Sequence, residues 1–182
     1  EVLAEGCADM VSMARPWLAD GHFMKKAAEG RGDEIVPCIG CNQACLDHTF
    51  SMKLTSCLLN PRACHETELN YPATDAPKTV AVVGAGPAGL ATSIVAAQRG
   101  HSVTLFDASA EIGGQLNMAK QIPGKEEFWG MVDYYRRAVE VAGVEQRLST
   151  VADADALADF DEVVIATGVA PRDPAIPGQD QP

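Results

Sequence analysis

Four cysteines in one short segment have the spacing of a metal centre. Cys38, Cys41, Cys45 and Cys57 follow the pattern C-x2-C-x3-C-x11-C within PCIGCNQACLDHTFSMKLTSCLLNP. Three close thiols on an irregular loop, joined by a fourth from further along, can surround a small cluster. Thiolates of this kind bind iron–sulfur clusters or zinc. The asymmetric spacing favours a 4Fe–4S cluster, because zinc sites usually show two short pairs of ligands; zinc remains the competing interpretation.

Disulfide bonds are the other possible use of these thiols, and the sequence gives no reason to expect an oxidising compartment. It contains neither a signal peptide nor an apolar span of membrane length, so we expect a cytoplasmic protein. Cys7 lies among small and apolar residues, which indicates a buried thiol. Cys64 is the one plausible substitute ligand for the metal centre.

A glycine-rich motif is the second candidate for chemistry. Gly84, Gly86 and Gly89 form a G-x-G-x-x-G pattern between a β-branched stretch, 79–83, and a predicted helix. This context is the dinucleotide-binding fingerprint. The first glycine permits a tight turn, the second lets a pyrophosphate approach the backbone, and the third allows close packing of helix on strand. Asp107, at the end of the next predicted strand, can bind a ribose hydroxyl.

Later segments indicate a flavin-binding half of a doubly wound sheet. The glycine pair that ends in Gly114 and is followed by Gln115 permits a second close backbone approach to a phosphate chain. A last buried strand ends in Ala-Thr-Gly. The expected elements are strands over 79–83, 102–106, 144–151 and 163–166 and helices over 90–99 and 125–142.

The segment before the cysteines predicts one βα unit. Residues 1–6 suit the end of a helix, 8–13 suit a buried parallel strand, and 22–29 suit a short helix. Between strand and helix lies Arg15. Loops after the last strands of a (β/α)8 barrel commonly hold a phosphate, and Arg15 could contact it bidentately. An arginine before a proline is also common at plain surface positions.

Composition and charge limit the classes of protein to which this chain can belong. The 182 residues are 47% hydrophobic and 21% charged, which is typical of a globular protein. A net charge of −11 without a block of Lys or Arg makes nucleic acid and anionic membranes poor partners. The chain starts inside an expected helix and stops at IPGQDQP before its last unit closes, so we expect a piece of a longer enzyme.

With these motifs together, the chain resembles the iron–sulfur flavoenzymes of the NADH:flavin oxidoreductase family, in particular the bacterial NADPH-dependent 2,4-dienoyl-CoA reductases of unsaturated fatty acid β-oxidation. The matching stretches span nearly the whole chain: DMVSMARPWLAD, CIGCNQACLD, SCLLNPRACHE, VAVVGAGPAGLA, VTLFDASAEIGGQ and KQIPGKEEF. The resemblance implies electron flow from NADPH to FAD, through the 4Fe–4S cluster to FMN, and on to an unsaturated acyl-CoA.

The resemblance also implies an α/β organisation in four parts. These are the terminal βα unit of an FMN-binding (β/α)8 barrel over 1–32, a 4Fe–4S loop over 33–71, a linker over 72–77, and an incomplete doubly wound FAD-binding domain, similar to glutathione reductase, over 78–182. The proton donor, the thioester site and the NADPH-binding insert are expected outside this chain, so it should contain no catalytic residue.

Particular site residues follow from the same resemblance. It implies that Ala14 and Arg15 contact the FMN phosphate and that the four cysteines of the C-x2-C-x3-C-x11-C pattern, not Cys64, bind the cluster. The implied FAD contacts are Ala88, Asp107, Gln115 and Lys125, with a backbone contact to adenine near Ala152.

Other functions stay open. A relative with the same layout, such as an amine dehydrogenase or an NADH oxidase, would carry the same motifs. A stand-alone FAD and iron–sulfur electron-transfer module would lack a substrate site. A zinc-binding scaffold would use the cysteines without redox chemistry.

Overall fold

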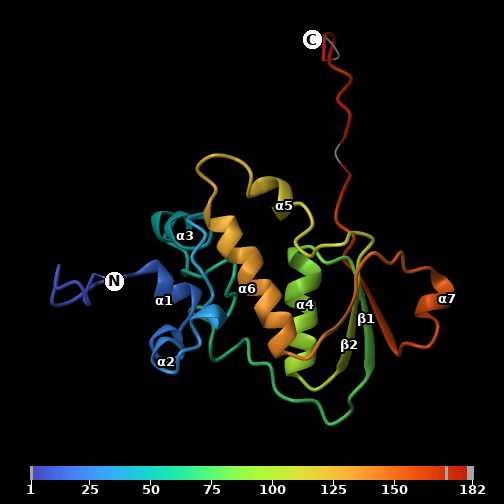
Figure 1. Cartoon of the computed structure of the whole chain (residues 1–182), viewed down its shortest axis with the longest axis horizontal. Coiled ribbons are helices and arrows are strands. Elements are labelled where there is room, and N and C mark those ends of the chain that lie inside the picture. Colours follow the sequence, from blue (N-terminus) through green and yellow to red (C-terminus); the bar gives the residue numbers. More distant parts are fainter. Residues whose placement is uncertain (1, 171, 180–182) are drawn as a thin grey trace.

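A parallel four-stranded sheet organises the C-terminal part of the chain. The computed structural model describes residues 2–170 and 172–179 (Figure 1). The strand order is β3-β2-β1-β4. Val82, in the centre of the sheet, pairs with Leu105 on one side and with Val164 on the other. The strands are β1 (Thr79–Val83), β2 (Ser102–Phe106), β3 (Glu145–Arg147) and β4 (Glu162–Ile165).

Helix α4 packs on the sheet and helix α6 packs beside α4, and both helices have a clear sequence cause. α4 begins at Pro87, three residues before the predicted start, because proline has the backbone angle of a first helical turn. α6 buries Met131, Val132, Tyr135 and Val139, which recur at helical spacing along one face. The helices of this region are α4 (Pro87–Gln98), α5 (Leu116–Ala119), α6 (Glu127–Val141) and α7 (Ala154–Leu157).

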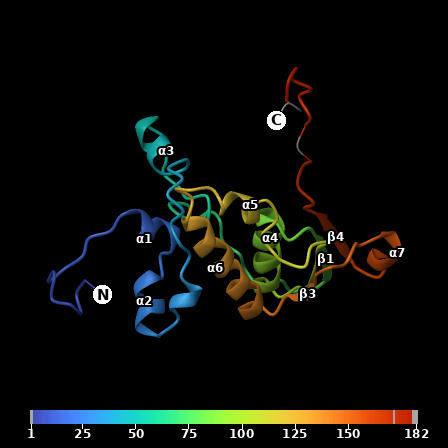
Figure 2. The same ribbon diagram turned by 45° about the horizontal axis from the view of Figure 1, so that its top comes forward.

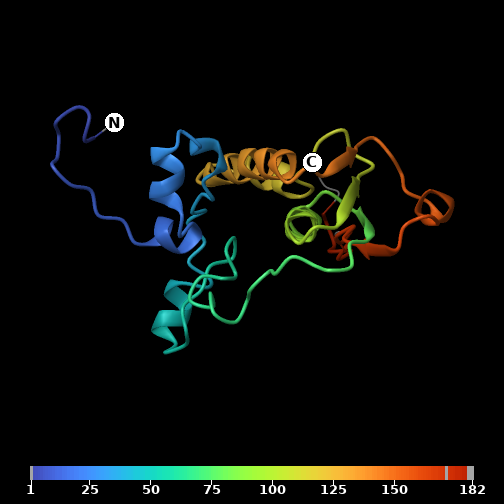
Figure 3. The ribbon, with the colours of Figure 1, turned by 90° about the horizontal axis from the view of Figure 1, so that it is seen from below.

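The N-terminal part forms short helices without a sheet. Figure 2 shows α3 projecting away from the rest of the molecule, and Figure 3 shows α6 running between these short helices and the strands. The elements are α1 (Arg15–Ala19), α2 (Phe23–Ala28), the 3-10 helix η1 (Gly32–Glu34) and α3 (Leu46–Phe50).

Two N-terminal predictions differ from the structure. Residues 8–13 form no strand, and residues 2–6 form turns where the end of a helix was expected. A strand needs a hydrogen-bonding neighbour, and none of the strands in the described part of the chain pairs with residues 8–13. Arg15 and Pro16, expected in a loop, begin α1, where proline is suited to the first turn. The helix expected over 22–29 is present as α2.

One hydrophobic core joins the cysteine segment to the sheet. Val82, Leu105 and Val132 are at most 1% exposed at its centre. Ile39 and Leu59, from the cysteine segment, are half-buried against the same core. The segment is therefore anchored by its own apolar side chains. Among the described residues, no helix is both long enough and apolar enough to cross a membrane.

Candidate functional site

The glycine-rich loop between β1 and α4 requires its first and third glycines for packing. Gly84 has a φ of +110°, and its N–H donates to the carbonyl of Phe106 at 2.7 Å. A Cβ atom at Gly84 would overlap the carbonyl of Ala166, and one at Gly89 would overlap the carbonyl oxygen of Gly84. The loop is thus pressed between β4 and α4, as the fingerprint predicts.

The second glycine faces open space. A Cβ atom on Gly86 would meet nothing within 4 Å. Gly86 is also the N-cap of α4 and supplies no side chain to the first-turn N–H groups, so the positive end of the helix dipole stays available to an anion. Gly114 lies against Gly86, since its Cβ would come to 3.1 Å from the Gly86 Cα. The Gly113 N–H donates to Ala85 at 2.7 Å. Two glycine turns thus form a cradle that fits a pyrophosphate.

Asp107 lies beside this cradle. One carboxylate oxygen accepts the N–H of Ala85 at 2.6 Å, and the other accepts the N–H of Ser109 at 2.7 Å. Each oxygen keeps acceptor capacity for a further hydrogen bond, which a ribose hydroxyl could supply. The Thr150 N–H donates to the backbone carbonyl of Asp107 at 2.8 Å. Ala152, two residues further on, lies in the loop between Thr150 and α7.

The structure places two of the remaining predicted FAD contacts beside the cradle and the third, Lys125, in the loop before α6. Ala88 is exposed in the first turn of α4. Gln115 donates from its side-chain amide to the carbonyl of Val169 at 3.0 Å, which ties the second glycine turn to the chain after β4. Lys125 stands in the loop before α6, and its ammonium lies 6.0 Å from the centre of the Phe128 ring. The structure thus brings Gln115 to the cradle and leaves Lys125 exposed at the start of α6.

The four predicted cluster ligands line one small cavity. Cys38, Cys41, Cys45 and Cys57 are half-buried, and all six cysteines carry free thiols. Apolar side chains form much of the remaining wall, which would keep water from a bound cluster; the wall also contains Arg15, Leu18, Ile39, Asn42, Ala44 and Leu58.

The backbone after Cys57 affects the pKa of its thiol. Burial raises the pKa of this thiol, the N–H groups of Leu59 and Asn60 oppose the rise by hydrogen bonding to the sulfur, and the nearby Cys41 and Cys38 thiols add to it. Hydrogen bonds to cluster sulfurs are one means by which proteins tune such centres. The spacing of the cysteines does not predict which backbone N–H groups act on the Cys57 sulfur.

The shared cavity gives the four thiols room around a common centre. Within residues 2–170 and 172–179, no three His, Cys, Asp or Glu side chains converge closely enough to hold one metal ion. In a 4Fe–4S cluster each thiolate binds a different iron, so four thiols around one cavity could hold such a cluster.

The other two cysteines lie outside this cavity. Cys64 is exposed, with a φ of +63°, and is absent from the cavity wall. Cys7 is exposed, whereas its apolar neighbours predicted burial. The reason is that residues 8–13 form no strand and therefore do not cover it.

Arg15 links the N-terminal segment to the cysteine loop. Its guanidinium donates to the side-chain oxygen of Asn42 at 2.8 Å. Asn42 has a φ of +62°, an uncommon conformation that asparagine tolerates better than most residues. Ala14, the other predicted FMN contact, is exposed at the N-cap of α1. Sequence reasoning missed Asn42, because its partner lies 27 residues away.

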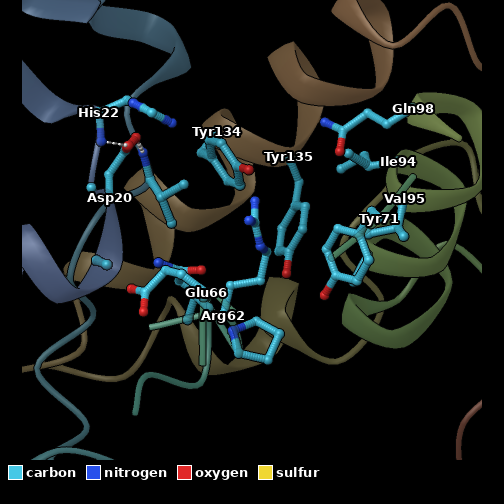
Figure 4. Close-up of a pocket in the computed structure, with 17 residues that line it drawn as sticks. Asp20, His22, Arg62, Glu66, Tyr71, Ile94, Val95, Gln98, Tyr134 and Tyr135 are labelled. Carbon is cyan, nitrogen blue, oxygen red and sulfur yellow. Dashed lines mark hydrogen bonds between the residues drawn. The ribbon is translucent and has the colours of Figure 1, made fainter. Parts of the chain in front are cut away.

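A cavity of about 540 Å³ lies elsewhere, between the N-terminal helices, the cysteine segment, α4 and α6 (Figure 4). The Arg62 guanidinium lies 5.6 Å from the centre of the Tyr71 ring in its wall. Burial, together with the neighbouring Tyr135 and Asp20, raises the pKa of Tyr134 to about 12. None of the predicted site residues lines this cavity.

The family model of the pyridine nucleotide-disulphide oxidoreductases matches residues 78–182, which contain both glycine turns and Asp107. The chain belongs to this family. Its α/β unit with a parallel sheet is therefore an FAD- and NAD(P)-binding oxidoreductase domain, and the predicted α/β fold with a parallel sheet is confirmed.

Known proteins of several kinds match this chain over nearly its whole length. A metal reductase of Desulforamulus reducens is 44% identical over 97% of this chain, and an NADH oxidase of Thermoanaerobacter brockii is 40% identical over 100% of it. The solved complex of 2-naphthoyl-CoA reductase with 2-naphthoyl-CoA is 37% identical over 99% of this chain, with a TM-score of 0.93. The chain spans 27% and 28% of the two relatives and 28% of the solved chain.

Proposed function

We propose that this chain is the cluster- and FAD-binding part of a longer oxidoreductase that reduces a carbon–carbon double bond in an unsaturated acyl-CoA, as an NADPH-dependent 2,4-dienoyl-CoA reductase does. The observation that carries the proposal is that the four-cysteine cavity and the glycine cradle are built on one hydrophobic core, joined by Ile39 and Leu59. The likeness to a reductase solved with a CoA thioester supports the substrate class.

The cysteine segment would hold the 4Fe–4S cluster. Its four thiolates would each ligate one iron, the apolar wall would exclude water, and the N–H groups of Leu59 and Asn60 would stabilise charge on the Cys57 sulfur. Ala14 and Arg15 would contact an FMN phosphate on the side of the cysteine loop where Arg15 meets Asn42.

The glycine cradle would hold FAD. The N-terminus of α4, together with Gly86 and Gly114, would bind the pyrophosphate, and Asp107 would bind the adenosine ribose. Ala152 would contact adenine, and Gln115 would hold the far end of the cofactor. When bound, the cofactors supply a path on which NADPH gives a hydride to FAD and electrons pass singly through the cluster to FMN and the double bond.

Cofactor binding by the chain itself tests the proposal. Anaerobic reconstitution with iron, sulfide and FAD should give about four iron atoms and about one FAD per chain, with a brown cluster absorbance. One equivalent of zinc with neither iron nor acid-labile sulfide would contradict it. The chain alone should not reduce a dienoyl-CoA with NADPH. Turnover above a flavin-only blank would show that catalytic groups lie within it.

An NADH oxidase is the second candidate, favoured by the 40% identity to the Thermoanaerobacter brockii enzyme. Both functions would use the same cradle and cluster, so cofactor content does not separate them. The complete protein should be assayed with NADH and oxygen and, in parallel, with NADPH and a dienoyl-CoA. Faster oxygen-dependent NADH consumption than thioester reduction would favour the oxidase.

A further inference from the structure

The cavity of about 540 Å³ in Figure 4 has the size and the walls of a small-molecule site. Such sites measure roughly 300–1,000 Å³ and combine apolar and aromatic walls with a few polar groups. Tyr71, Tyr134 and Tyr135 supply aromatic rings here, and Ile94 and Val95 supply apolar surface from α4. Walls of this kind suit a ligand that carries a flat ring.

A positive charge in this wall has no counter-ion. Among the described residues that line the cavity, Arg62 is the one Lys or Arg, and it is half-buried. None of the ion pairs within residues 2–170 and 172–179 includes it. An Nη donates to the side-chain oxygen of Asn70 at 3.4 Å, and the buried Nε donates to no described residue. An anion in the cavity would therefore supply what the guanidinium lacks.

The two acids of the wall already have other partners. Asp20 accepts a hydrogen bond from the Lys26 ammonium at 2.6 Å. Glu66 accepts the backbone N–H of Cys64 at 3.1 Å. Neither acid neutralises Arg62, so its guanidinium is left for a ligand.

Tyrosine hydroxyls add hydrogen-bond donors next to this charge. Figure 4 shows the Arg62 side chain extending toward the tyrosines of α6, Tyr134 and Tyr135. No hydrogen bond joins either hydroxyl to another residue drawn around the cavity. Burial raises the pKa of both phenols, so at neutral pH they stay protonated and can donate to an anion.

The turn that carries Arg62 is fixed by contacts on both sides. The side-chain amide of Asn60 donates to the carbonyl of Leu18 at 2.8 Å. Ala63 is 2% exposed, and its N–H donates to the carbonyl of Asn60 at 2.9 Å. The Arg62 guanidinium also lies 5.6 Å from the centre of the Tyr71 ring. A group held in place in this way loses little freedom when it binds a ligand.

We propose that this cavity binds a planar aromatic carboxylate, with the carboxylate on Arg62 and the ring among the tyrosines. The inference goes beyond the proposed function, because no predicted cofactor contact lines the cavity. One guanidinium matches the single charge of a carboxylate and can hold it by two parallel hydrogen bonds. A phosphate monoester carries a charge of about −1.5 to −2. It fits less well, since Asp20 and Glu66 share this wall with the one arginine.

Four matched probes test the ligand class by calorimetric titration of the unchanged chain. Benzoate should saturate one site. Benzamide has the same ring without the charge and should bind about tenfold or more weakly. Cyclohexanecarboxylate has the charge without the flat ring and should bind about two- to tenfold more weakly. Phenyl phosphate should bind no more tightly than benzoate.

Three results of this titration would overturn the proposal. They are no saturable binding of benzoate in the millimolar range, equal binding of benzoate and benzamide, and tighter binding of phenyl phosphate than of benzoate. The last would assign the cavity to a phosphate ester. None of these comparisons requires a variant, so they stand even if substitutions in the wall prevent folding.

Substitution of Arg62 assigns the charge. Arg62→Gln should raise the dissociation constant of benzoate by about tenfold or more and leave that of benzamide unchanged. Loss of both ligands would instead indicate a damaged cavity and would overturn the assignment to Arg62. Arg62→Lys keeps the charge without the paired donors, so benzoate should bind with intermediate affinity.

A second arginine provides the control. Arg136 lies on α6, is 53% exposed and pairs with Asp133 at 2.6 Å, outside the cavity wall. Arg136→Gln removes the same charge from the chain and should leave benzoate binding unchanged. Equal benzoate affinity in Arg62→Gln and Arg136→Gln would mean that Arg62 does not bind the carboxylate.

The relatives are longer than this chain, so the complete protein is titrated as well. Benzoate should bind there with the same preference over benzamide. Loss of benzoate binding in the complete protein would overturn the site, because another part of that protein would then fill the cavity.

Discussion

The carboxylate of Asp107 accepts a hydrogen bond from the backbone N–H of Ala85 at 2.6 Å. Asp107 follows β2, and Ala85 lies within the glycine-rich loop, so the acid predicted to bind ribose also holds the loop predicted to bind pyrophosphate. The second carboxylate oxygen accepts the N–H of Ser109. One short side chain therefore orders two neighbouring parts of the cofactor cradle before any ligand arrives.

We expect Asp107→Asn to weaken both the fold and FAD binding. The amide offers one acceptor oxygen, so either Ala85 or Ser109 loses its acceptor. A lost partner of this kind costs about 1–3 kcal/mol in the free energy of unfolding, and the dissociation constant of FAD should rise by about tenfold or more. Urea unfolding and flavin fluorescence titration measure the two effects. Ser109→Ala keeps the backbone N–H, so it should change neither the free energy of unfolding nor the affinity for FAD. Wild-type FAD affinity in Asp107→Asn would refute a role of Asp107 in FAD binding.

The two glycines Gly86 and Gly89 should respond differently to the same substitution. Gly86→Val places its side chain in open space, so the cofactor-free chain should stay folded but lose FAD. Gly89→Val forces overlap with the Gly84 carbonyl and should lower the free energy of unfolding by about 1–3 kcal/mol or more. Thermal unfolding and FAD titration compare the two. Stoichiometric FAD in Gly86→Val, or displacement of FAD by NADPH at the cradle, would contradict the assignment.

The sequence predicted the central strands and the cradle because their causes are local. Runs of β-branched residues mark β1 and β2 within the predicted ranges, and Gly84 and Gly89 lie where the loop leaves no room for a Cβ atom. Apolar residues at helical spacing placed α6 within two residues at its start. Such signals need no knowledge of distant contacts.

The contacts that unite the two sites were not predictable in this way. Ile39 looks like one apolar residue in a loop, and only the folded chain shows that it packs on the core of a sheet that begins 40 residues later. A Cβ atom added to Gly130 would likewise lie within about 4 Å of Pro37, which is 93 positions away in the sequence. Residues 8–13 show the opposite error, since an apolar run predicts a strand only if a partner strand lies beside it.

Among the cysteines, we expect Cys41→Ala to abolish the cluster and Cys64→Ala to spare it. Cys41 lines the shared cavity, whereas Cys64 is exposed outside it. Iron and acid-labile sulfide should fall to background in Cys41→Ala after anaerobic reconstitution and stay at the wild-type level in Cys64→Ala. The reverse outcome would show that Cys64, and not Cys41, is a ligand of the cluster. Equal cluster content in both variants would show that Cys41 is not a ligand.

Asp20 gives a prediction for the pH dependence of stability. Its carboxylate is 4% exposed and accepts hydrogen bonds from Lys26 at 2.6 Å and from the N–H groups of His22 and Val36. Burial alone would raise its pKa, but these partners together outweigh burial and lower it below 3.8. A carboxyl with a lowered pKa in the folded state stabilises the fold above its unfolded pKa, and the stabilisation disappears as the pH falls through the folded pKa.

We therefore expect Asp20→Asn to lower the free energy of unfolding by about 1–3 kcal/mol at neutral pH, because a buried charged acceptor is lost. The difference from the unchanged chain should hold at neutral pH and shrink once the pH drops below 3.8, where the unfolded carboxyl also takes up its proton. Asp133→Asn is the control, since Asp133 pairs with Arg136 at 66% exposure and should change stability by less than about 1 kcal/mol. Urea unfolding from pH 3 to pH 8 (about 25 °C) measures both variants. A difference that grows as the pH falls would mean that the folded-state pKa of Asp20 is raised, and that burial outweighs its partners.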